Sequence, residues 1–322
     1  MNQRILYAAG VAALLALTSC AAPAATPAAG PDTAAPTTVN VAETTGVPSA
    51  FLQYGVDQGF FADRGLTVNV DVSAGGAAAV PALVSGNIQF AGSNAVSVLI
   101  ASSKGLPLKV IAPGTRTAES AELDFSKVLV AGDSDIEDVA DLAGRKVAVN
   151  TLANISEVSL RAALGNLGAD ASNIEFVELG LPDMLPALEQ GHVDAALSIE
   201  PFVTMGVDDG ARAVLSPYAQ SMPGLMVGAY ITTEDYLSGN PEVVAAFREG
   251  LEDTSASIAS DPDAFRAALP EYAKVSEAAA TSMNLPEWKP GVSRESLEFL
   301  NEKSVEYGLF DEAVDIDALV AE

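Results

Sequence analysis

Residues 82–91, ALVSGNIQFA, and residues 187–196, ALEQGHVDAA, share the pattern A-L-x-x-G-x-[IV]-x-x-A and lie 105 residues apart. Each copy has the order of a helix end, a glycine that can cap the helix, and a short apolar strand. One match of this kind can arise by chance in a chain rich in alanine, so the repeat needs support from the elements on either side. With that support, the sequence indicates two similar halves.

The elements around both copies alternate between strand and helix. The helix start at residue 155 is well defined, because Asn154 and Glu157 resemble a capping box, and Gly168 follows the helix end. Such alternation is typical of parallel α/β layers. The predicted strands are 39–43, 66–72, 88–91 and 108–112, then 127–131, 147–150, 174–179 and 193–199; the predicted helices are 48–61, 77–85, 93–103, 155–167 and 182–190.

The chain beyond residue 230 is predicted to be helical. Asn240 and Pro241 open a segment in which Val244, Phe247 and Leu251 recur at helical spacing. A second amphipathic stretch covers residues 293–307. We expect these helices to return and pack on the first half.

The amino terminus has the features of a secretory signal. Arg4 precedes the apolar stretch 5–17, which is too short for the roughly 20 residues of a membrane-spanning helix. Leu17-Thr18-Ser19-Cys20 matches the lipobox of bacterial lipoproteins, and Cys20 is the only cysteine in the chain. We therefore expect cleavage before Cys20 and lipidation of Cys20, which would anchor the protein to the bacterial membrane on its extracytoplasmic side and leave no thiol for disulfides.

Composition limits the partners of the protein. Residues 21–38 consist mostly of Ala, Pro and Thr, a composition that cannot bury enough surface to fold and is typical of a tether. The net charge is −27, so nucleic acid and anionic headgroups would be repelled over most of the surface. The remaining residues, from about 39 to 322, are enough for one large or two medium domains.

A specific resemblance covers residues 146–202. This run contains VAVNTLANI, LRAAL, PDMLPALEQG, VDAA and the closing Glu200-Pro201-Phe202; the first half adds YGVDQGFF at 54–61, GLTVNVDV at 65–72, the turn 73–76 and ALVSGNIQFAGSNA at 82–95. Over about 39–230 the chain resembles the SsuA/THI5-like solute-binding lipoproteins of ABC transporters, the sulfonate, nitrate and taurine group that also includes thiamine-pyrimidine binders. The resemblance implies an α/β, periplasmic-binding-protein-like type II fold, in which two α/β lobes joined by two crossing segments hold a ligand cleft between them.

This fold implies a division of the chain into segments. We expect a signal peptide at 1–19, the lipidated Cys20 with its tether to residue 38, a first lobe at 39–122, a second lobe at 123–222, and a return to the first lobe with C-terminal helices at 223–322.

The ligand site is expected at the carboxyl ends of the strands, where loops enter helix starts and backbone N–H groups are unpaired. Four loops rich in Ser, Asn, Thr or Gly occupy such positions, and for each the same residues could merely cap the helix. The candidates are Ser49, Gly75 and Gly76, Gly92-Ser93-Asn94, and Asn150, Thr151 and Asn154.

Larger side chains give further candidates and open alternatives. Glu200 and Phe202 follow the strand 193–199, where the resemblance implies a ligand or hinge role and Pro201 alone could make a strand-ending turn. Phe51 and Tyr54 could stack on a planar ligand, although aromatics at this spacing are more often core. Three others have weaker claims: Arg116 in a loop that could hold an anion or be solvated, Trp288 as a packing anchor or platform, and His192 at the surface.

The sequence contains no recognisable catalytic or metal motif. G-x-S-x-G, Walker and H-E-x-x-H patterns are absent, and the single histidine has no cysteine or second histidine with which to form a metal site. We therefore expect no cofactor and no catalysis. The predicted function is capture of a small solute, sulfonate-like, for an ABC permease by a protein acting as a monomer. The alternatives are binding of a thiamine-related pyrimidine or another flat heterocycle, an accessory sensor, and an enzyme on the same fold.

Overall fold

The computed structural model describes residues 35–73, 75–171 and 173–321. The predicted signal peptide, the predicted lipidation site Cys20, most of the predicted tether and Ala74 lie outside these residues. Residues 35–322 form one compact unit, which is described here. Within the described part of the chain, no helix combines the length and the apolar character that crossing a bilayer requires.

The first sheet has five strands in the order β2-β1-β3-β10-β4. Its strands are β1 (Thr37–Thr44), β2 (Leu66–Ser73), β3 (Phe90–Asn94), β4 (Leu108–Pro113) and β10 (Gly228–Thr233). β1 pairs in parallel with both β2 and β3, whereas β10 runs antiparallel to β3 and β4. The sheet is therefore completed by a strand that follows it in sequence by more than a hundred residues.

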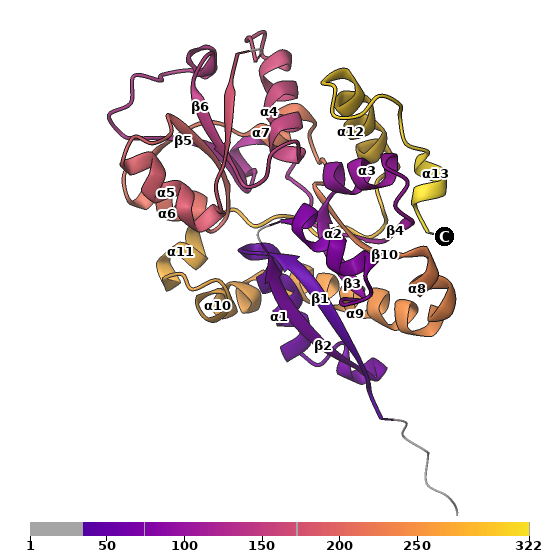
Figure 1. Ribbon diagram of the computed structural model, residues 1–322. Helices are drawn as coiled ribbons and strands as arrows, with labels where there is room; N and C mark the ends of the chain where they lie inside the picture. The colour runs from indigo at the N-terminus through magenta and orange to yellow at the C-terminus, as the bar shows by residue number, and fades with distance from the viewer. Residues whose placement is uncertain (1–34, 74, 172, 322) are drawn as a thin grey trace, which may run out of the picture. The chain divides into compact units, whose positions relative to one another are not determined.

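The second sheet repeats this arrangement, with the order β7-β6-β8-β5-β9. Its strands are β5 (Ser126–Val130), β6 (Lys146–Val149), β7 (Glu175–Glu178), β8 (Ala195–Ile199) and β9 (Arg212–Leu215). β6 is parallel to β7 and β8, and β5 is antiparallel to β8 and β9. Figure 1 shows β5 and β6 in the upper part of the view, apart from β1, β2 and β3 below.

The chain passes between the sheets twice, from β4 to β5 and from β9 to β10. The strand reached after each passage is the one that runs antiparallel, so the expectation of purely parallel layers is wrong at β5 and β10. The physical reason is that a strand entering from the other lobe need not follow a right-handed β-α-β crossover, which is what enforces parallel pairing within each lobe. The two α/β lobes themselves are as predicted.

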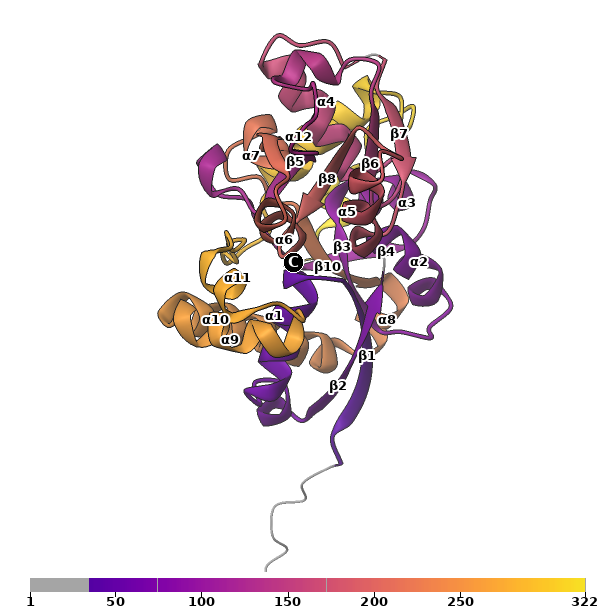
Figure 2. The same cartoon turned by 90° about the vertical axis from the view of Figure 1, so that its left-hand side faces the viewer.

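Helices flank both sheets. Between the strands of the first sheet these are α1 (Val47–Asp57), α2 (Gly76–Val84) and α3 (Ala95–Ser103). In the segment that forms the second sheet they are α4 (Ile155–Asn166), α5 (Leu181–Glu189) and α6 (Phe202–Asp208), followed by α7 (Pro217–Ser221). Short 3-10 helices lie at η1 (Ala62–Arg64), η2 (Ala121–Leu123) and η3 (Val139–Leu142). The sequence repeat corresponds to α2 with β3 and to α5 with β8. Figure 2 shows α5 beside β8 in the upper part of the view and α2 near β3 and β4.

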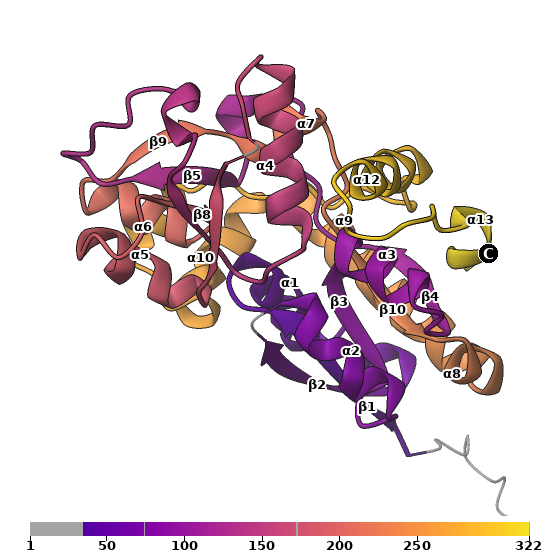
Figure 3. The same ribbon diagram turned by 45° about the horizontal axis from the view of Figure 1, so that its top comes forward.

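The C-terminal helices pack on both lobes. They are α8 (Glu234–Gly239), α9 (Pro241–Ser260), α10 (Pro262–Tyr272), α11 (Glu277–Ser282), α12 (Arg294–Glu306) and α13 (Ile316–Leu319). α9 covers the first sheet, where Phe247 stacks on Phe90 with ring centroids 4.1 Å apart. α12 contacts α3 and also α4, as Figure 3 shows. α9 thus contacts the first sheet, whereas α12 contacts a helix from each of the two α/β lobes.

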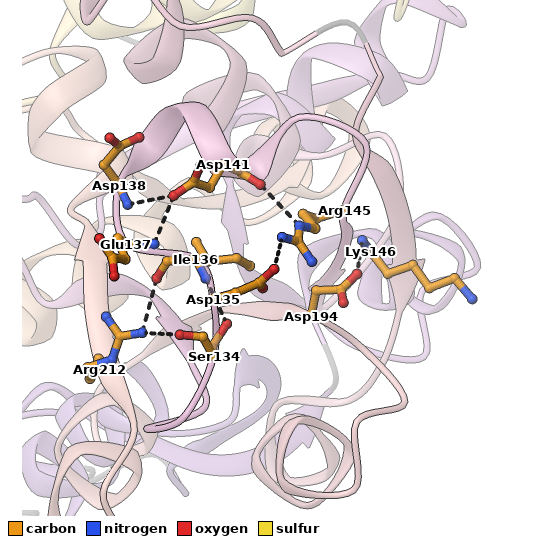
Figure 4. A network of polar contacts seen from close by, with 10 residues as sticks. All are labelled: Ser134, Asp135, Ile136, Glu137, Asp138, Asp141, Arg145, Lys146, Asp194 and Arg212. Carbon is orange, nitrogen blue, oxygen red and sulfur yellow. Dashed lines mark hydrogen bonds and ion pairs between the residues drawn. The ribbon is translucent and has the colours of Figure 1, made fainter.

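Charged side chains order the loop at the amino ends of β6 and β8. Arg145 donates to the carboxylate of Asp135 over 2.8 Å. Arg212 donates to three backbone carbonyls, those of Gly132, Ser134 and Ile136. The backbone N–H of Lys146 donates to the carboxylate of Asp194 over 2.8 Å. Figure 4 shows this network, which lies at the opposite end of these strands from the cavity described next and therefore serves to hold the loop.

Candidate functional site

A cavity lies between the carboxyl ends of the two sets of strands. Its volume is about 60 Å³. Both lobes supply its walls. The first lobe contributes Glu43, Thr44, Pro48, Gly92, Ser93, Asn94, Gly114, Thr115, Val227, Gly228, Ala229 and Tyr230; the second contributes Phe125, Asn150, Ile155, Ser156, Leu181, Leu197, Ile199 and Tyr218; Trp288 comes from the C-terminal segment.

Four of the predicted site residues line this cavity: Gly92, Ser93, Asn94 and Asn150. β3 extends through Asn94, so the first three belong to a strand end and not to the predicted loop and helix start. The carbonyl oxygen of the Asn94 side chain caps α3 by accepting from the N–H of Ser97 over 2.9 Å. Capping and position at the cavity are therefore combined in one residue.

Four other predicted residues lie outside the lining, close to where the lobes meet. A Cβ on Gly75 would be 2.8 Å from Nδ2 of Asn150, and a Cβ on Gly76 would be 1.9 Å from Oγ of Ser93. Asn154 is fully buried at the start of α4, where its side-chain amide donates to Asn150 and to Thr151 over 2.9 and 2.8 Å. Asn154 is thereby bonded to Asn150, which lines the cavity.

The predicted residues of α1 also lie behind the cavity wall. Ser49 donates to the carbonyl of Gly46 over 2.9 Å and is buried. Phe51 stacks on Trp288 with centroids 4.6 Å apart, and Tyr54 packs edge-on against Phe265. Of this stacked pair, Trp288 lines the cavity and Phe51 packs behind it.

Glu200 and Phe202 do not line the cavity. The Glu200 carboxylate accepts from the N–H and the hydroxyl of Thr204 and from the N–H of Asn284, and burial raises its pKa. The carbonyl of Glu200 accepts from the N–H of Val47 over 3.4 Å, which joins the second lobe to the start of α1. Phe202 lies in a separate groove with Pro186.

Of the three remaining candidates, one lines the cavity and two do not. Trp288 lines the cavity as well as packing on Phe51, so both of its proposed roles are compatible with its position. Arg116 is absent from the lining; its guanidinium donates to the carbonyl of Gly291 over 3.0 Å, and its backbone pairs with Glu287. His192 is exposed.

Sequence reasoning missed the acidic residue of the cavity. Glu43 is 5% exposed, and its carboxylate accepts from the N–H of Thr44 over 2.7 Å and interacts with the hydroxyl of Tyr230. A Cβ on Gly92 would lie 1.9 Å from Oε2 of Glu43, so the glycine on β3 makes room for the carboxyl group. The available signal was an acidic residue at the end of a predicted strand, which is where ligands bind in α/β sheets.

The electrostatics of the cavity are dominated by that carboxyl group. Burial raises the pKa of Glu43 to about 7, against smaller opposing effects of the hydrogen bonds from Thr44 and Tyr230. Burial also raises the pKa of Tyr218 and of Tyr230, so both phenols stay protonated at neutral pH. Among the described residues no lysine, arginine or histidine lines the cavity, and no group of His, Cys, Asp and Glu side chains could hold a metal ion.

Comparison with known proteins gives consistent matches. The family model described as NMT1/THI5 like matches residues 49–265. The taurine-binding periplasmic protein of Escherichia coli (strain K12) is 27% identical over 221 residues, covering 69% of this chain and 66% of that protein. The formylaminopyrimidine-binding protein of Halalkalibacterium halodurans is 24% identical over 200 residues, or 61% of this chain and 58% of that protein. The structure of the alkanesulfonate-binding protein SsuA from Xanthomonas axonopodis pv. citri bound to MOPS has a TM-score of 0.76 at 17% identity, covering 89% of this chain and 99% of that one.

These matches differ in what they establish. The chain matches just under two thirds of the length of the taurine-binding relative and 58% of the formylaminopyrimidine-binding one. The likeness to SsuA confirms the predicted fold class, a periplasmic-binding-protein-like arrangement of two α/β lobes.

Proposed function

Because the chain belongs to the NMT1/THI5-like family, we propose that it is the solute-binding protein of an ABC importer. It captures a small organic anion, sulfonate-like, in the cavity between its lobes and delivers it to the permease subunits. The observation that carries this proposal is a cavity whose walls come from both lobes, at the strand ends where α/β proteins bind ligands. The names of the taurine-binding and alkanesulfonate-binding proteins support the ligand class.

Two of the contacts between the lobes involve residues next to the cavity lining. Val47 donates to the carbonyl of Glu200, and Gly75 lies against Asn150. A ligand that contacts both walls favours this arrangement over a separated one, because a ligand shifts an equilibrium only through its differential affinity for the two states. The closed arrangement is then what the permease recognises. Gly92, Ser93, Asn94 and Asn150 contact the solute, and the other predicted site residues position them.

The remaining features follow from this role. Lipidation at Cys20 holds the protein at the extracytoplasmic face of the membrane, and the segment to residue 38 acts as its tether. The segments 39–122 and 223–322 build one lobe and 123–222 the other. The protein works as a monomer, binds no nucleic acid and needs no cofactor.

A flat heterocycle is the second candidate ligand. Trp288 presents an aromatic ring to the cavity, and the formylaminopyrimidine-binding relative supports this class. Ligand capture for a membrane-bound sensor and catalysis on the same fold would use the same cavity.

A panel of ligands distinguishes these functions. We expect the protein to be stabilised by short sulfonates such as taurine, by about 2.7 kcal/mol at a hundred times the dissociation constant, in a thermal-shift assay. Trp288 is the only tryptophan of the chain and lines the cavity, so its fluorescence should change in parallel. Stabilisation by formylaminopyrimidine alone would favour the heterocycle. Conversion of a bound compound into product, followed by NMR, would favour an enzyme, and uptake lost on deletion of the permease separates import from sensing.

Closure of the lobes is tested at Gly75. Its φ is 163°, an extended value open to any residue, so the effect of Gly75→Leu is steric and falls on Asn150 across the lobe contact. We expect the affinity for a bound sulfonate to fall about tenfold or more, as for an overpacked contact, with little change in melting temperature. Ala78→Leu, on the exposed side of the same helix, is the matched control. Equal affinities of the two variants would show that the lobes need not meet here.

A further inference from the structure

Glu43 is placed at the cavity in a way that ordinary packing does not require. It is the penultimate residue of β1, is 5% exposed, and has the N–H of Thr44 and the hydroxyl of Tyr230 as its hydrogen-bond partners. The neighbouring strand has glycine at position 92, where any side chain would collide with the carboxylate. Two strands are therefore shaped around one acidic group at the wall of the cavity.

The carboxyl group has no compensating charge. Among the described residues the cavity lining contains no lysine, arginine or histidine, and the pKa of Glu43 is raised to about 7 by burial with no opposing effect from a nearby cation. A buried carboxylate without a counter-charge is costly, and a positively charged partner would remove most of that cost. A bare anion such as nitrate would instead add a second negative charge beside Glu43.

The opposite wall has a different character. From the second lobe, Asn150 and the first residues of α4, Ile155 and Ser156, face the cavity. The N–H of Ser156 already donates to the side chain of Asn154, and Glu157 in the first turn of α4 pairs with Arg161. The polar side chains of Asn150 and Ser156, together with the dipole of this 12-residue helix, therefore favour the negative end of a ligand here. The aromatic rings of Trp288, Tyr218 and Tyr230 complete the wall and can also face a cation favourably.

We infer that Glu43 receives a protonated nitrogen of the ligand, so that the solute is an amine-bearing organic acid and not a simple anion. This inference rests on the proposed function, because it assigns the two ends of a solute held between the lobes. The ammonium group contacts Glu43 beside Tyr230, and the oxyanion lies at the α4 side. Glu43 is then the residue that distinguishes aminosulfonates from plain sulfonates.

The first test compares matched ligands by isothermal titration with the full protein. Taurine (2-aminoethanesulfonate) and ethanesulfonate differ in the amine. We expect taurine to bind to the wild type at least a hundredfold more tightly than ethanesulfonate. Glu43→Gln should remove most of this difference, as for loss of one partner of a buried charge pair. The same variant should change the affinity for ethanesulfonate by less than about threefold. Glu175→Gln, which removes an exposed acid of β7, controls for net charge. Equal binding of the two sulfonates would overturn the inference and leave the proposed function intact.

The pH dependence of taurine affinity tests the inference independently. Tyr230 from β10 hydrogen-bonds to Glu43, and Tyr218 from α7 is the other titratable residue that lines the cavity. Both phenols remain protonated between about pH 5.5 and about pH 8. Binding of an ammonium group requires ionised Glu43, so taurine affinity should rise with pH up to about 7 and then level off, and this rise should vanish in Glu43→Gln. A sulfonate held by the protonated carboxyl group would show the opposite slope, which would overturn the inference.

The inference about Glu43 can still be tested if no sulfonate binds to the protein. In that event the anion class of the proposed function is wrong, and amines without a sulfonate, such as 4-aminopyrimidine and ethanolamine, are titrated against wild type and Glu43→Gln. Binding that depends on Glu43 would uphold the inference alone. If none of these amines binds through Glu43, both proposals fail.

Discussion

Replacement of Phe247 by alanine should lower the free energy of unfolding by about 3–5 kcal/mol, the range for removing a buried phenylalanine. Phe247 is fully buried on α9. Its ring stacks on Phe90 of β3 at 4.1 Å and 2°, on Phe61 at 5.5 Å, and meets Tyr230 of β10 edge-on at 5.8 Å. The cavity left by this change lies between α9 and the first sheet, which cannot collapse without moving several aromatic rings.

Urea-induced unfolding of the ligand-free protein measures this effect. Leu167→Ala is the control, because Leu167 is 48% exposed at the end of α4 and its loss should change stability by less than about 0.5 kcal/mol. A decrease below about 1 kcal/mol for Phe247→Ala would show that α9 is not a stable part of the first lobe.

Replacement of Glu43 by glutamine should make the ligand-free protein more stable at high pH. The folded-state pKa of Glu43 is about 7 against an ordinary value of 4.5, so between these two values the unfolded chain releases a proton that the folded protein retains. Stability therefore falls as pH rises from about 4.5 to about 7, in total by roughly 3 kcal/mol at 1.36 kcal/mol for each pKa unit. Glutamine keeps the size and polarity of the side chain but cannot ionise.

The difference between Glu43→Gln and wild type is the quantity to measure. It should be near zero at about pH 4, where the carboxyl group is protonated in both states, and should reach roughly 3 kcal/mol in favour of the variant at about pH 8. Denaturant unfolding at a series of pH values gives this curve, with Glu175→Gln as an exposed-acid control. A difference independent of pH would mean that Glu43 titrates normally. Together with the ligand titrations, a more stable variant that binds worse would identify Glu43 as a residue kept for binding at the expense of stability.

The repeated halves of this fold could be predicted from the sequence because their signals are local. The repeat at 82–91 and 187–196 combines a helix end, a glycine with positive φ (Gly86 and Gly191) and an apolar strand, and each piece depends on neighbouring residues. The direction of a strand within a sheet does not depend on neighbouring residues in the same way. β5 and β10 have the same apolar character as parallel strands, and only their pairing partners, far away in the sequence, reveal that they run the other way.

The site could be predicted in part for the same reason. Residues 92–94 and Asn150 follow predicted strands, so a general rule about strand ends finds them. Trp288 reaches the cavity from the C-terminal segment through its stack on Phe51, and Tyr218 and Tyr230 reach it from elements that the sequence did not reveal. Glu43 was overlooked because a charged residue at a strand end is usually solvated, and its burial depends on the space left by Gly92 in another strand.

The place of β10 in the first sheet has a consequence for how the chain acquires its structure. β4 pairs with β10, and β10 lies between β4 and β3, so the first sheet stays split until residues 228–233 have been made. The strands of the second sheet come from the uninterrupted stretch 126–215, which can pair as soon as it is available. Since contacts near in sequence form before distant ones, the middle of the polypeptide should become ordered ahead of its beginning.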